Sequence, residues 1–315
     1  MSDADARKNT VLKIASSQLG APPQNLESPF TVLASPAWRG VEADIWVAQW
    51  GDATRVYKHY HPDTAFYVDA VNAMQIARQV GDLGVAPTVE KTWDESALME
   101  MRHVGISWRA GGLHDAADSV IRLRVVAAKK TIQGGPRFAR DADIFGEIRA
   151  LHAFCIAHRV KLPQFIDAYL GFAQHAEHAI RAVGVDKVPC HRDGNTSNLM
   201  IGPNQEVLLL DFDLAANADP YEDVGCYLIE MFEREPEARA GFEEWHGSFS
   251  ESLFQRAMTY GFLDDLRWGL IASGMAATSP RKTLEFAKYA SWRYLRFDQN
   301  SQRSHAADRL RKLGK

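Results

Sequence analysis

Two short polar segments lie close together about two thirds of the way along the chain, and they constrain its fold more than any other feature. The first is "PCHRDGNTSNLMI", residues 189–201, and the second ends the apolar run "VLLLDFDLAA", residues 207–216. A glycine and an Asn-Thr-Ser run disfavour regular structure, so Asp193 and Asn198 are predicted to lie on a loop. A short hairpin and a buried strand then bring Asp211 close to that loop.

These three side chains offer hard oxygen ligands to one small volume. Mg²⁺ prefers one or two carboxylates together with substrate phosphates. In phosphoryl transfer one carboxylate accepts the proton of the attacking hydroxyl, while another, with an amide oxygen, holds the metal. The same residues also suit a capped turn before a hairpin, in which Asp193 and Asn198 bond only to the backbone, because Asn and Asp are ordinary turn formers. The residues alone leave both interpretations open.

Composition and charge exclude several classes of protein. The chain has 315 residues, which is enough for two lobes, and its 46% hydrophobic and 24% charged residues are typical of a soluble globular protein. A net charge of −4 argues against general binding to nucleic acid. The N-terminus lacks the apolar segment of a signal peptide, and no stretch approaches the roughly 20 apolar residues of a membrane span. Three cysteines without CxxC spacing indicate reduced thiols and a cytoplasmic location.

The periodicity of apolar residues divides the chain into two parts. Alternating patterns predict strands over residues 30–35, 43–50, 54–60, 85–93 and 96–101, with one helix over residues 63–84. Helical patterns follow over residues 115–133, 139–157, 163–183 and from residue 221 to the end, interrupted by a hairpin over residues 198–211. This order predicts an α+β fold with a small β-rich N-lobe, residues 1–102, and a larger helical C-lobe, residues 103–315. A cleft between two lobes is a usual place for a ligand.

The pattern His-x-Asp-x-x-x-x-Asn, followed by an apolar strand that ends in Asp, resembles the protein-kinase-like superfamily. His191, Asp193, Asn198 and Asp211 stand at those positions. The chain more closely resembles the aminoglycoside phosphotransferase and choline/ethanolamine kinase family, because "LLLDFDLAANADPYEDVG" also carries that family's Asp-Pro-x-x-Asp element. The resemblance is strong over residues 189–228. It implies a bilobal protein-kinase-like fold, ATP and Mg²⁺ as cofactors, and transfer of a phosphate to a hydroxyl of a small molecule.

The resemblance also implies a role for each matching residue. Asp193 is the catalytic base or the group that orients the hydroxyl, and Asn198 and Asp211 bind Mg²⁺. Asp213 either assists a second metal or is a solvated acid at the end of the strand. His191 is expected to bridge the catalytic loop and the metal-binding loop. In the second element, Asp219 is expected to cap the helix that begins near Pro220, and Asp223 to tie that helix to the catalytic loop.

A phosphate-binding cation is predicted on the third strand, "TRVYKHYHP". Alternation places Val56, Lys58 and Tyr60 on one face, toward the cleft. A lysine on a buried strand face needs an anion, so Lys58 matches the phosphate-binding lysine of the family. The alternative is a lysine on an edge strand that points to solvent, where most lysines lie.

Other nucleotide contacts are predicted from the loops of the N-lobe. The segment "SPAWRGVEA", residues 35–43, holds a single glycine, Gly40, and its backbone N–H groups suit phosphates, with Arg39 adding charge. The backbone from Glu100 through Met101 to Arg102 is expected to read the edge of adenine. Met99 or Met101 is expected to pack on the adenine ring.

The helix acid that pairs with the lysine in this superfamily has no clear counterpart here. Its counted position falls near Asn72, and the nearest acid upstream is Asp69. Helical spacing puts Asp69 on the inward face with Phe66 and Ala73, so we expect an Asp69–Lys58 ion pair. The alternative is that nucleotide and Asp211 alone hold Lys58.

Two classes of function remain at this stage. The leading prediction is an ATP-dependent kinase of an amino alcohol, an aminosugar or a sugar, and the alternative is a catalytically degenerate nucleotide-binding pseudokinase. Acids such as Glu230 among aromatics such as Trp245, Trp292 and Tyr294 favour a cationic amine slightly over a neutral acceptor. The same residues also fit a solvated helix face and an ordinary core. The oligomeric state is not indicated.

Overall fold

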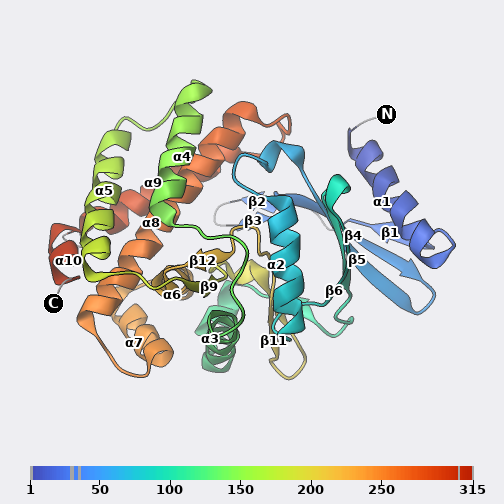
Figure 1. Cartoon of the computed structure of the whole chain (residues 1–315), viewed down its shortest axis with the longest axis horizontal. Coiled ribbons are helices and arrows are strands. Elements are labelled where there is room, and N and C mark those ends of the chain that lie inside the picture. The colour runs from blue at the N-terminus through green and yellow to red at the C-terminus, as the bar shows by residue number, and fades with distance from the viewer. Residues whose placement is uncertain (1–2, 29–31, 35–36, 304–305, 314–315) are drawn as a thin grey trace.

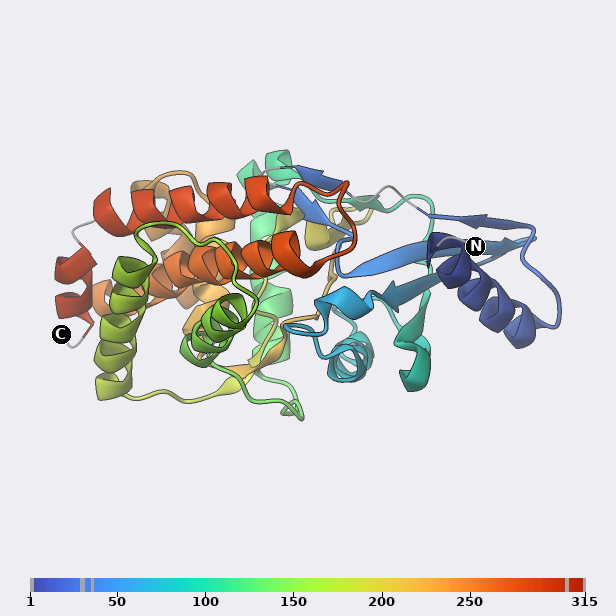
Figure 2. The same cartoon turned by 90° about the horizontal axis from the view of Figure 1, so that it is seen from above.

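A computed structural model of the chain describes residues 3–28, 32–34, 37–303 and 306–313. The protein has two lobes side by side along its longest axis (Figures 1 and 2). One lobe is built around a sheet and contains the N-terminus, and the other is helical and contains the C-terminus. The predicted α+β class with a small β-rich lobe and a larger helical lobe is therefore confirmed. The division at residue 102 stays a prediction.

The sheet of the N-lobe has five antiparallel strands in the order β1-β4-β5-β7-β6. The strands are β1 (Asn25–Glu27), β4 (Ala43–Trp50), β5 (Ala53–Tyr60), β6 (Val89–Trp93) and β7 (Leu98–Arg102). The register places Lys58 of β5 opposite Ile45 of β4 and Met99 of β7. Lys58 is thus in the middle of the sheet and not on an edge strand.

The two faces of this sheet are covered by different helices (Figure 1). Helix α2 (Ala70–Asp82) packs on the face that continues into the main core. Helix α1 (Asp3–Leu19) packs on the other face, where Val11 and Ala15 meet Tyr57. Arg7 anchors α1 because its guanidinium donates to the carbonyls of His59 and Tyr60. Sequence reasoning missed α1, whose apolar stripe is only weakly marked.

Three predicted starts of elements in the N-lobe were wrong, namely those of the helix over 63–84 and of the strands over 85–93 and 96–101. The helix predicted over 63–84 begins at Ala70, because a 3₁₀ turn (Pro62–Thr64) precedes it and Asp69 caps it. The strand predicted over 30–35 contributes to a hairpin of β2 (Val32–Ala34) and β3 (Ala37–Arg39), and its remaining residues lie outside the described ones. A 3₁₀ turn (Asp94–Ser96) separates the last two strands, which begin later than predicted.

The C-lobe is organised around one long buried helix, α8 (Glu251–Thr278), which packs against α4, α6 and α9. The other helices are α3 (Ser119–Gln133), α4 (Ile144–Ala157), α5 (Ile166–Val183), α6 (Pro220–Met231), α7 (Glu235–His246), α9 (Phe286–Arg303) and α10 (Ala306–Lys312). Among the helices that the structure describes, none is both long and apolar enough to cross a membrane.

Two small sheets in the C-lobe bring together the two polar segments identified from the sequence, residues 189–201 and 207–216. Strand β9 (Val188–Cys190) pairs with β12 (Ala216–Ala218), and β10 (Leu199–Ile201) pairs with both β11 (Val207–Leu209) and β8 (Arg109–Ala110). The loop from β9 to β10 and the loop from β11 to β12 consequently lie next to each other. The first carries Asp193 and Asn198, and the second carries Asp211 and Asp213.

Helices α6 and α8 approach so closely at Gly225 that no side chain fits there. A Cβ atom at Gly225 would lie 2.3 Å from the Ala257 carbonyl oxygen and 2.6 Å from the Gly261 nitrogen. We expect Gly225→Ala to lower the free energy of unfolding by about 1–3 kcal/mol, because two backbones must separate. Gly171→Ala in α5 is the matched control, since a Cβ there meets nothing within 4 Å.

The control is expected to raise the free energy of unfolding by up to about 1 kcal/mol through helix propensity. Urea denaturation of both variants measures the two changes. A Gly225→Ala protein as stable as the parent would contradict this description of the α6–α8 contact.

Candidate active site

The loop of residues 191–198, called the catalytic loop after the role predicted for Asp193, is held by an acid of helix α6. Asp223 is fully buried and accepts hydrogen bonds from the backbone N–H of His191 (3.1 Å) and of Arg192 (2.8 Å). Its Oδ1 also accepts from Nζ of Lys129, at 2.9 Å. The predicted tie between this helix and the catalytic loop is confirmed, as is the cap that Asp219 provides by accepting from the N–H of Tyr221.

Lys129 is a positioning residue that sequence reasoning missed. It is 1% exposed, and its Nζ donates to the carbonyl of Asp193 at 2.7 Å and lies 3.3 Å from Nδ1 of His191. The available signal was a lysine within a helical segment that is otherwise apolar on that side. A buried ammonium needs such partners, so Lys129 joins α3 to this loop.

His191 connects the catalytic loop to the loop that carries Asp211, as predicted. Its Nε2 donates to the carbonyls of Leu210 (2.8 Å) and Asp211 (2.9 Å). Nδ1 is then the acceptor toward Lys129, which fits a neutral ring. Burial first, and the charge of Lys129 second, lower the pKa of His191 to about 4. The neutral His191 ring therefore links the two loops through hydrogen bonds and does not carry a proton in the reaction.

Asp193 is oriented by its own loop. Its Oδ1 accepts from the N–H of Asn195 at 2.6 Å, and its Oδ2 accepts from Nδ2 of Asn198 at 2.8 Å. Burial, followed by the charge of Asp211, raises the pKa of Asp193 to about 7. A carboxylate with this pKa is well matched to accepting a proton near neutral pH. Because the amide nitrogen of Asn198 faces Asp193, its amide oxygen is the atom left for a cation.

Lys58 lies at the centre of the cleft and pairs with two aspartates of the C-lobe. Its Nζ lies 2.8 Å from Oδ1 of Asp211 and 2.6 Å from Oδ1 of Asp213, and the hydroxyl of Tyr60 donates to the same oxygen of Asp213 at 2.8 Å. Burial opposes the charge on Lys58, but Asp211 and Asp213 outweigh it and raise its pKa. Asp211 adopts a φ of 65°, which is uncommon for a non-glycine residue and is found at functional sites.

The pKa values of Asp211 and Asp213 are shifted in opposite directions. Burial opposes ionisation of Asp211, but the charge of Lys58 lowers its pKa below the ordinary value. Burial, followed by the charge of Asp211, raises the pKa of Asp213 well above its ordinary range. Asp213 is 5% exposed, so the alternative of a solvated acid at the strand end is wrong.

The expected ion pair between Asp69 and Lys58 was wrong. Asp69 has extended backbone angles and caps α2, where its side chain accepts from the N–H of Asn72 at 3.1 Å. Among the described residues, the carboxylates within ion-pair distance of Lys58 are Asp211 and Asp213. The argument from a shared helical face failed because the helix begins only after Asp69.

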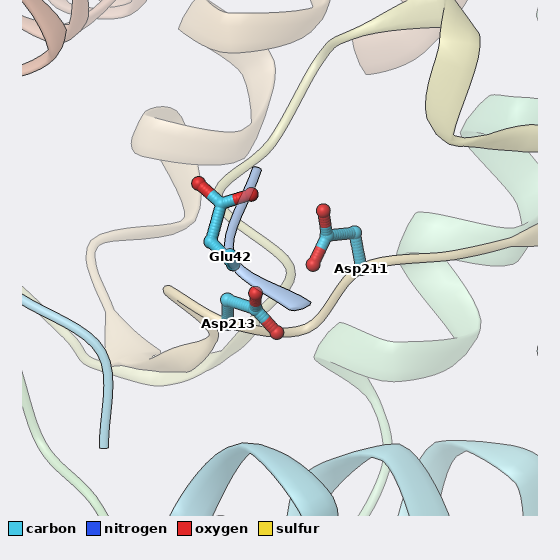
Figure 3. Close-up of side chains that lie close together, drawn as sticks. All are labelled: Glu42, Asp211 and Asp213. Carbon is cyan, nitrogen blue, oxygen red and sulfur yellow. The ribbon is translucent and has the colours of Figure 1, made fainter. Parts of the chain in front are cut away.

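Glu42 is the second residue that sequence reasoning missed. It precedes β4 in the N-lobe and is 3% exposed, and its Oε1 accepts from Nε1 of Trp38 (2.5 Å) and from the hydroxyl of Tyr67 (3.1 Å). One oxygen from each of Glu42, Asp211 and Asp213 lies within 4.8 Å of the others (Figure 3). Burial first, and the charge of Asp211 second, raise the pKa of Glu42 to about 7. The available signal was an acid between the apolar residues Val41 and Ala43.

A pocket of about 300 Å³ lies between the lobes, next to Lys58. Its polar end is formed by Lys58, Asn198 and Asp211. Apolar side chains from both lobes line the rest, including Ile45, Val47, Val56, Met99, Met101, Met200 and Leu210. The predicted Met99 and Met101 thus face this pocket together.

The other predicted nucleotide contacts have different outcomes. Gly40, with a φ of 63°, and Arg102 line the same pocket. The side chain of Glu100 lies on the opposite face of β7, where it pairs with Arg55 at 3.1 Å, and the contact expected of its backbone stays a prediction. The side chain of Arg39 lies outside the described part of the chain.

A second, much smaller pocket of about 20 Å³ adjoins the first and contains Asp193; it is called the narrow pocket below. Asn198 and Asp211 line both pockets. The walls of the second pocket are aromatic and charged, with Trp38, Trp268, Tyr289, Glu230, Asp264 and Arg293. Of the side chains named from sequence, Glu230 lies here, whereas Trp245 packs in the core against Tyr227 with ring centroids 5.3 Å apart. The other two predicted aromatics, Trp292 and Tyr294, are also outside this lining.

Comparison with known proteins agrees with this geometry. Residues 34–258 match the sequence profile of the phosphotransferase enzyme family. The chain belongs to this family. No curated protein matches the sequence of this phosphotransferase.

Solved structures similar to this phosphotransferase include kinases of small molecules. A choline/ethanolamine kinase family protein from Mesorhizobium loti is 18% identical, with a TM-score of 0.77 over 96% of this chain and 98% of that one. A choline kinase from Streptococcus pneumoniae is 15% identical, with a TM-score of 0.75 over 93% and 98%. A spectinomycin phosphotransferase, solved with ADP and spectinomycin, is 13% identical, with a TM-score of 0.60 over 93% and 98%. These likenesses confirm the predicted bilobal kinase fold.

The position of Asp69 generates a test that separates helix capping from nucleotide binding. We expect Asp69→Ala to lower the free energy of unfolding by about 0.5–2 kcal/mol through loss of the cap, with nucleotide affinity unchanged. Lys58→Ala, in contrast, is expected to abolish nucleotide binding. Urea denaturation and calorimetric titration with a nucleotide analogue measure the two properties. Asp69→Asn, which keeps a capping side chain, is the control, and a loss of affinity in Asp69→Ala would restore the discarded ion pair.

Proposed function

We propose that this phosphotransferase is an ATP-dependent kinase that moves the γ-phosphate to a hydroxyl of a small molecule, with Mg²⁺ as the cation. The observation that carries the proposal is that two adjoining pockets share Asn198 and Asp211, with Lys58 on one side and Asp193 on the other. A donor in the larger pocket and an acceptor in the narrower one would meet at the shared residues. Two of the similar structures were solved with AMP or ADP, which supports a nucleotide donor.

The larger pocket has the surfaces that an adenine nucleotide needs. Methionines and valines of both lobes suit the purine ring, and the backbone around Met101 and Arg102 suits its polar edge. Lys58 stands at the polar end, where its pairs with Asp211 and Asp213 aim the ammonium at the phosphates. The lysine is thus oriented before nucleotide arrives, which reduces the entropy lost on binding.

The side chains that line both pockets suit a divalent cation. Carboxylate and amide oxygens are the donors that Mg²⁺ prefers, and Asn198 and Asp211 supply both kinds. Oδ2 of Asp213 is buried without a hydrogen-bond partner, so this oxygen is also available to a cation. We assign Asn198 and Asp211 as the main ligands and Asp213 as the additional one. Bound Mg²⁺ would screen the negative charge of the phosphates.

Asp193 is proposed as the base that accepts the hydroxyl proton. Its two oxygens are fixed by Asn195 and Asn198, and the loop behind it is fixed by Lys129 and Asp223. The hydroxyl of an acceptor in the narrow pocket would lie between Asp193 and the phosphate end of the larger pocket. Proton acceptance by Asp193 would make the oxygen a better nucleophile as it attacks phosphorus.

The narrow pocket favours an acceptor that carries an amine. Four acids line it, namely Asp193, Asp211, Glu230 and Asp264. Asp211 pairs with Lys58, Asp264 with Arg267, and Glu230 with Arg293 and Arg296, so Asp193 is the lining acid without an ion pair among the described residues. The side chains of Trp38, Trp268 and Tyr289 complete the wall. The ring centroid of Trp38 lies 5.3 Å from that of Trp268 and 4.6 Å from that of Tyr289. Acids with aromatic faces stabilise ammonium groups. We therefore place amino alcohols and aminosugars ahead of neutral sugars, and we propose a cytoplasmic location, where ATP is available and the three buried free cysteines stay reduced.

Replacement of the base tests the reaction. We expect Asp193→Asn to lower kcat by about 10²- to 10⁴-fold, because a general base is removed, while ATP affinity stays close to that of the parent. Steady-state kinetics with the best acceptor and calorimetry with an ATP analogue measure the two quantities. Full activity in this variant would reject the assignment. Absence of phosphate transfer by the parent to any acceptor would favour the pseudokinase alternative.

The charge of the acceptor pocket generates a test of substrate class. Amino alcohols, aminoglycosides and neutral sugars are assayed with ATP and Mg²⁺, and each active amine is compared with an isosteric neutral analogue. We expect kcat/KM to be about 30-fold higher for the amine, since a desolvated cation–π contact contributes about 2 kcal/mol. Equal kcat/KM values for the two members of a pair would contradict recognition of the ammonium group.

A further inference from the structure

The three acids at the edge of the nucleotide pocket come from both lobes. Glu42 belongs to the N-lobe segment between β3 and β4, whereas Asp211 and Asp213 belong to the loop after β11 in the C-lobe. Their carboxylates face a common point (Figure 3), and one oxygen of each lies within 4.8 Å of the others. Two of these acids are almost completely buried, with Glu42 3% and Asp213 5% exposed.

When its three acids are ionised, the cluster contains more negative charge than its neighbours offset. Lys58 contacts Asp211 and Asp213, and one ammonium balances one of three carboxylates. A separate observation points to a missing ligand: Oδ2 of Asp213 is buried and has no hydrogen-bond partner among the described residues. Burial of an unpaired carboxylate oxygen is costly. The remaining charge matches a divalent cation, which prefers carboxylate oxygens of this kind.

Glu42 is held in place by two donors that end on the same oxygen. Nε1 of Trp38 and the hydroxyl of Tyr67 both donate to Oε1, so the carboxylate cannot rotate freely away from the aspartates. Trp38 is itself fixed by ring contacts with Trp268 and Tyr289 in the narrow pocket. The orientation of Glu42 therefore depends on residues of both lobes.

We propose that Glu42 is a third carboxylate ligand of the divalent-cation site, so that the cation binds the nucleotide-free protein and links the N-lobe segment before β4 to Asp211 and Asp213. This inference rests on the proposed function only for the physiological identity of the cation. A purely structural Glu42 would instead serve as an acceptor for Trp38 and Tyr67. A glutamine at this position also accepts both hydrogen bonds, but it binds a divalent cation more weakly because it lacks the negative charge.

Titration of the nucleotide-free protein with Mn²⁺, followed by the EPR signal of the free ion, tests the proposal. We expect one Mn²⁺ site in the parent and at least tenfold weaker binding in Glu42→Gln. Asp52→Asn is the matched control, because Asp52 lies exposed in the turn between β4 and β5 and its loss changes the charge equally. This control is expected to bind Mn²⁺ as the parent does.

Thermal unfolding supplies a second readout that does not depend on activity. Saturating Mn²⁺ is expected to raise the Tm of the parent and of Asp52→Asn, and to raise that of Glu42→Gln much less at the same concentration, since a ligand stabilises the form that binds it. Without Mn²⁺ the Tm of Glu42→Gln is expected to be no lower than that of the parent, because the hydrogen bonds from Trp38 and Tyr67 are retained.

Two results would overturn the proposal: equal Mn²⁺ affinity of the parent and Glu42→Gln, or no Mn²⁺ binding by the parent at millimolar concentration without nucleotide. Failure of the proposed function is recognised separately, by phosphate-transfer assays on the parent. A protein that binds Mn²⁺ through Glu42 but transfers no phosphate would retain the inference and lose the function. If the parent transfers phosphate and Glu42→Gln binds Mn²⁺ as the parent does, the proposed function is retained and the inference about Glu42 is lost.

Discussion

The buried contact of Lys58 with Asp211 and Asp213 is the interaction on which the arrangement of the cleft depends. It joins the central strand of the N-lobe sheet to the loop after β11 in the C-lobe, across more than 150 residues of sequence. Removal of Lys58 would leave the two aspartates without their cation, and breaking a buried pair in this way costs about 3–5 kcal/mol. The lobes are therefore held in register at the point where the two pockets meet.

A second layer of buried charge holds the catalytic loop against the C-lobe. Arg192 is 1% exposed and has a φ of 63°, and its guanidinium pairs with Glu147 of α4 at 2.6 Å and with Glu222 of α6 at 2.7 Å. Lys129 and Asp223 fix the same loop from α3 and α6. Because each charge has a partner, the loop is rigid without a regular secondary structure. A rigid loop keeps Asp193 at one position relative to Asn198 and Asp211, as transfer between two pockets requires.

Much of the fold and part of the candidate site were predictable from local patterns. Alternation placed Lys58 on the inward face of β5, and the turn residues placed Asp193 and Asn198 on a loop. Asp69 was predicted to lie within the helix and to pair with Lys58, but it caps the start of the helix. A periodic pattern does not distinguish an aspartate at a helix start from one on the inward face of the helix. Helix α1 was missed because its contacts with the sheet depend on few apolar residues. The sequence left Trp245 open between an acceptor pocket and the core, because an aromatic residue near acids has the same local pattern in both, and the structure places it in the core.

By itself the sequence determined the local chemistry of this protein. The spacing from His191 to Asp211 indicated a loop, a hairpin and a set of candidate oxygen ligands, because turn preferences and alternation act over a few residues. Only the tertiary structure decided which distant charges share a site. Asp213, and not Asp69, became the second partner of Lys58, and Glu42 joined the aspartates from the other lobe. These contacts arise from the docking of two lobes, and a contact between residues far apart in the chain leaves no periodic signal in either segment.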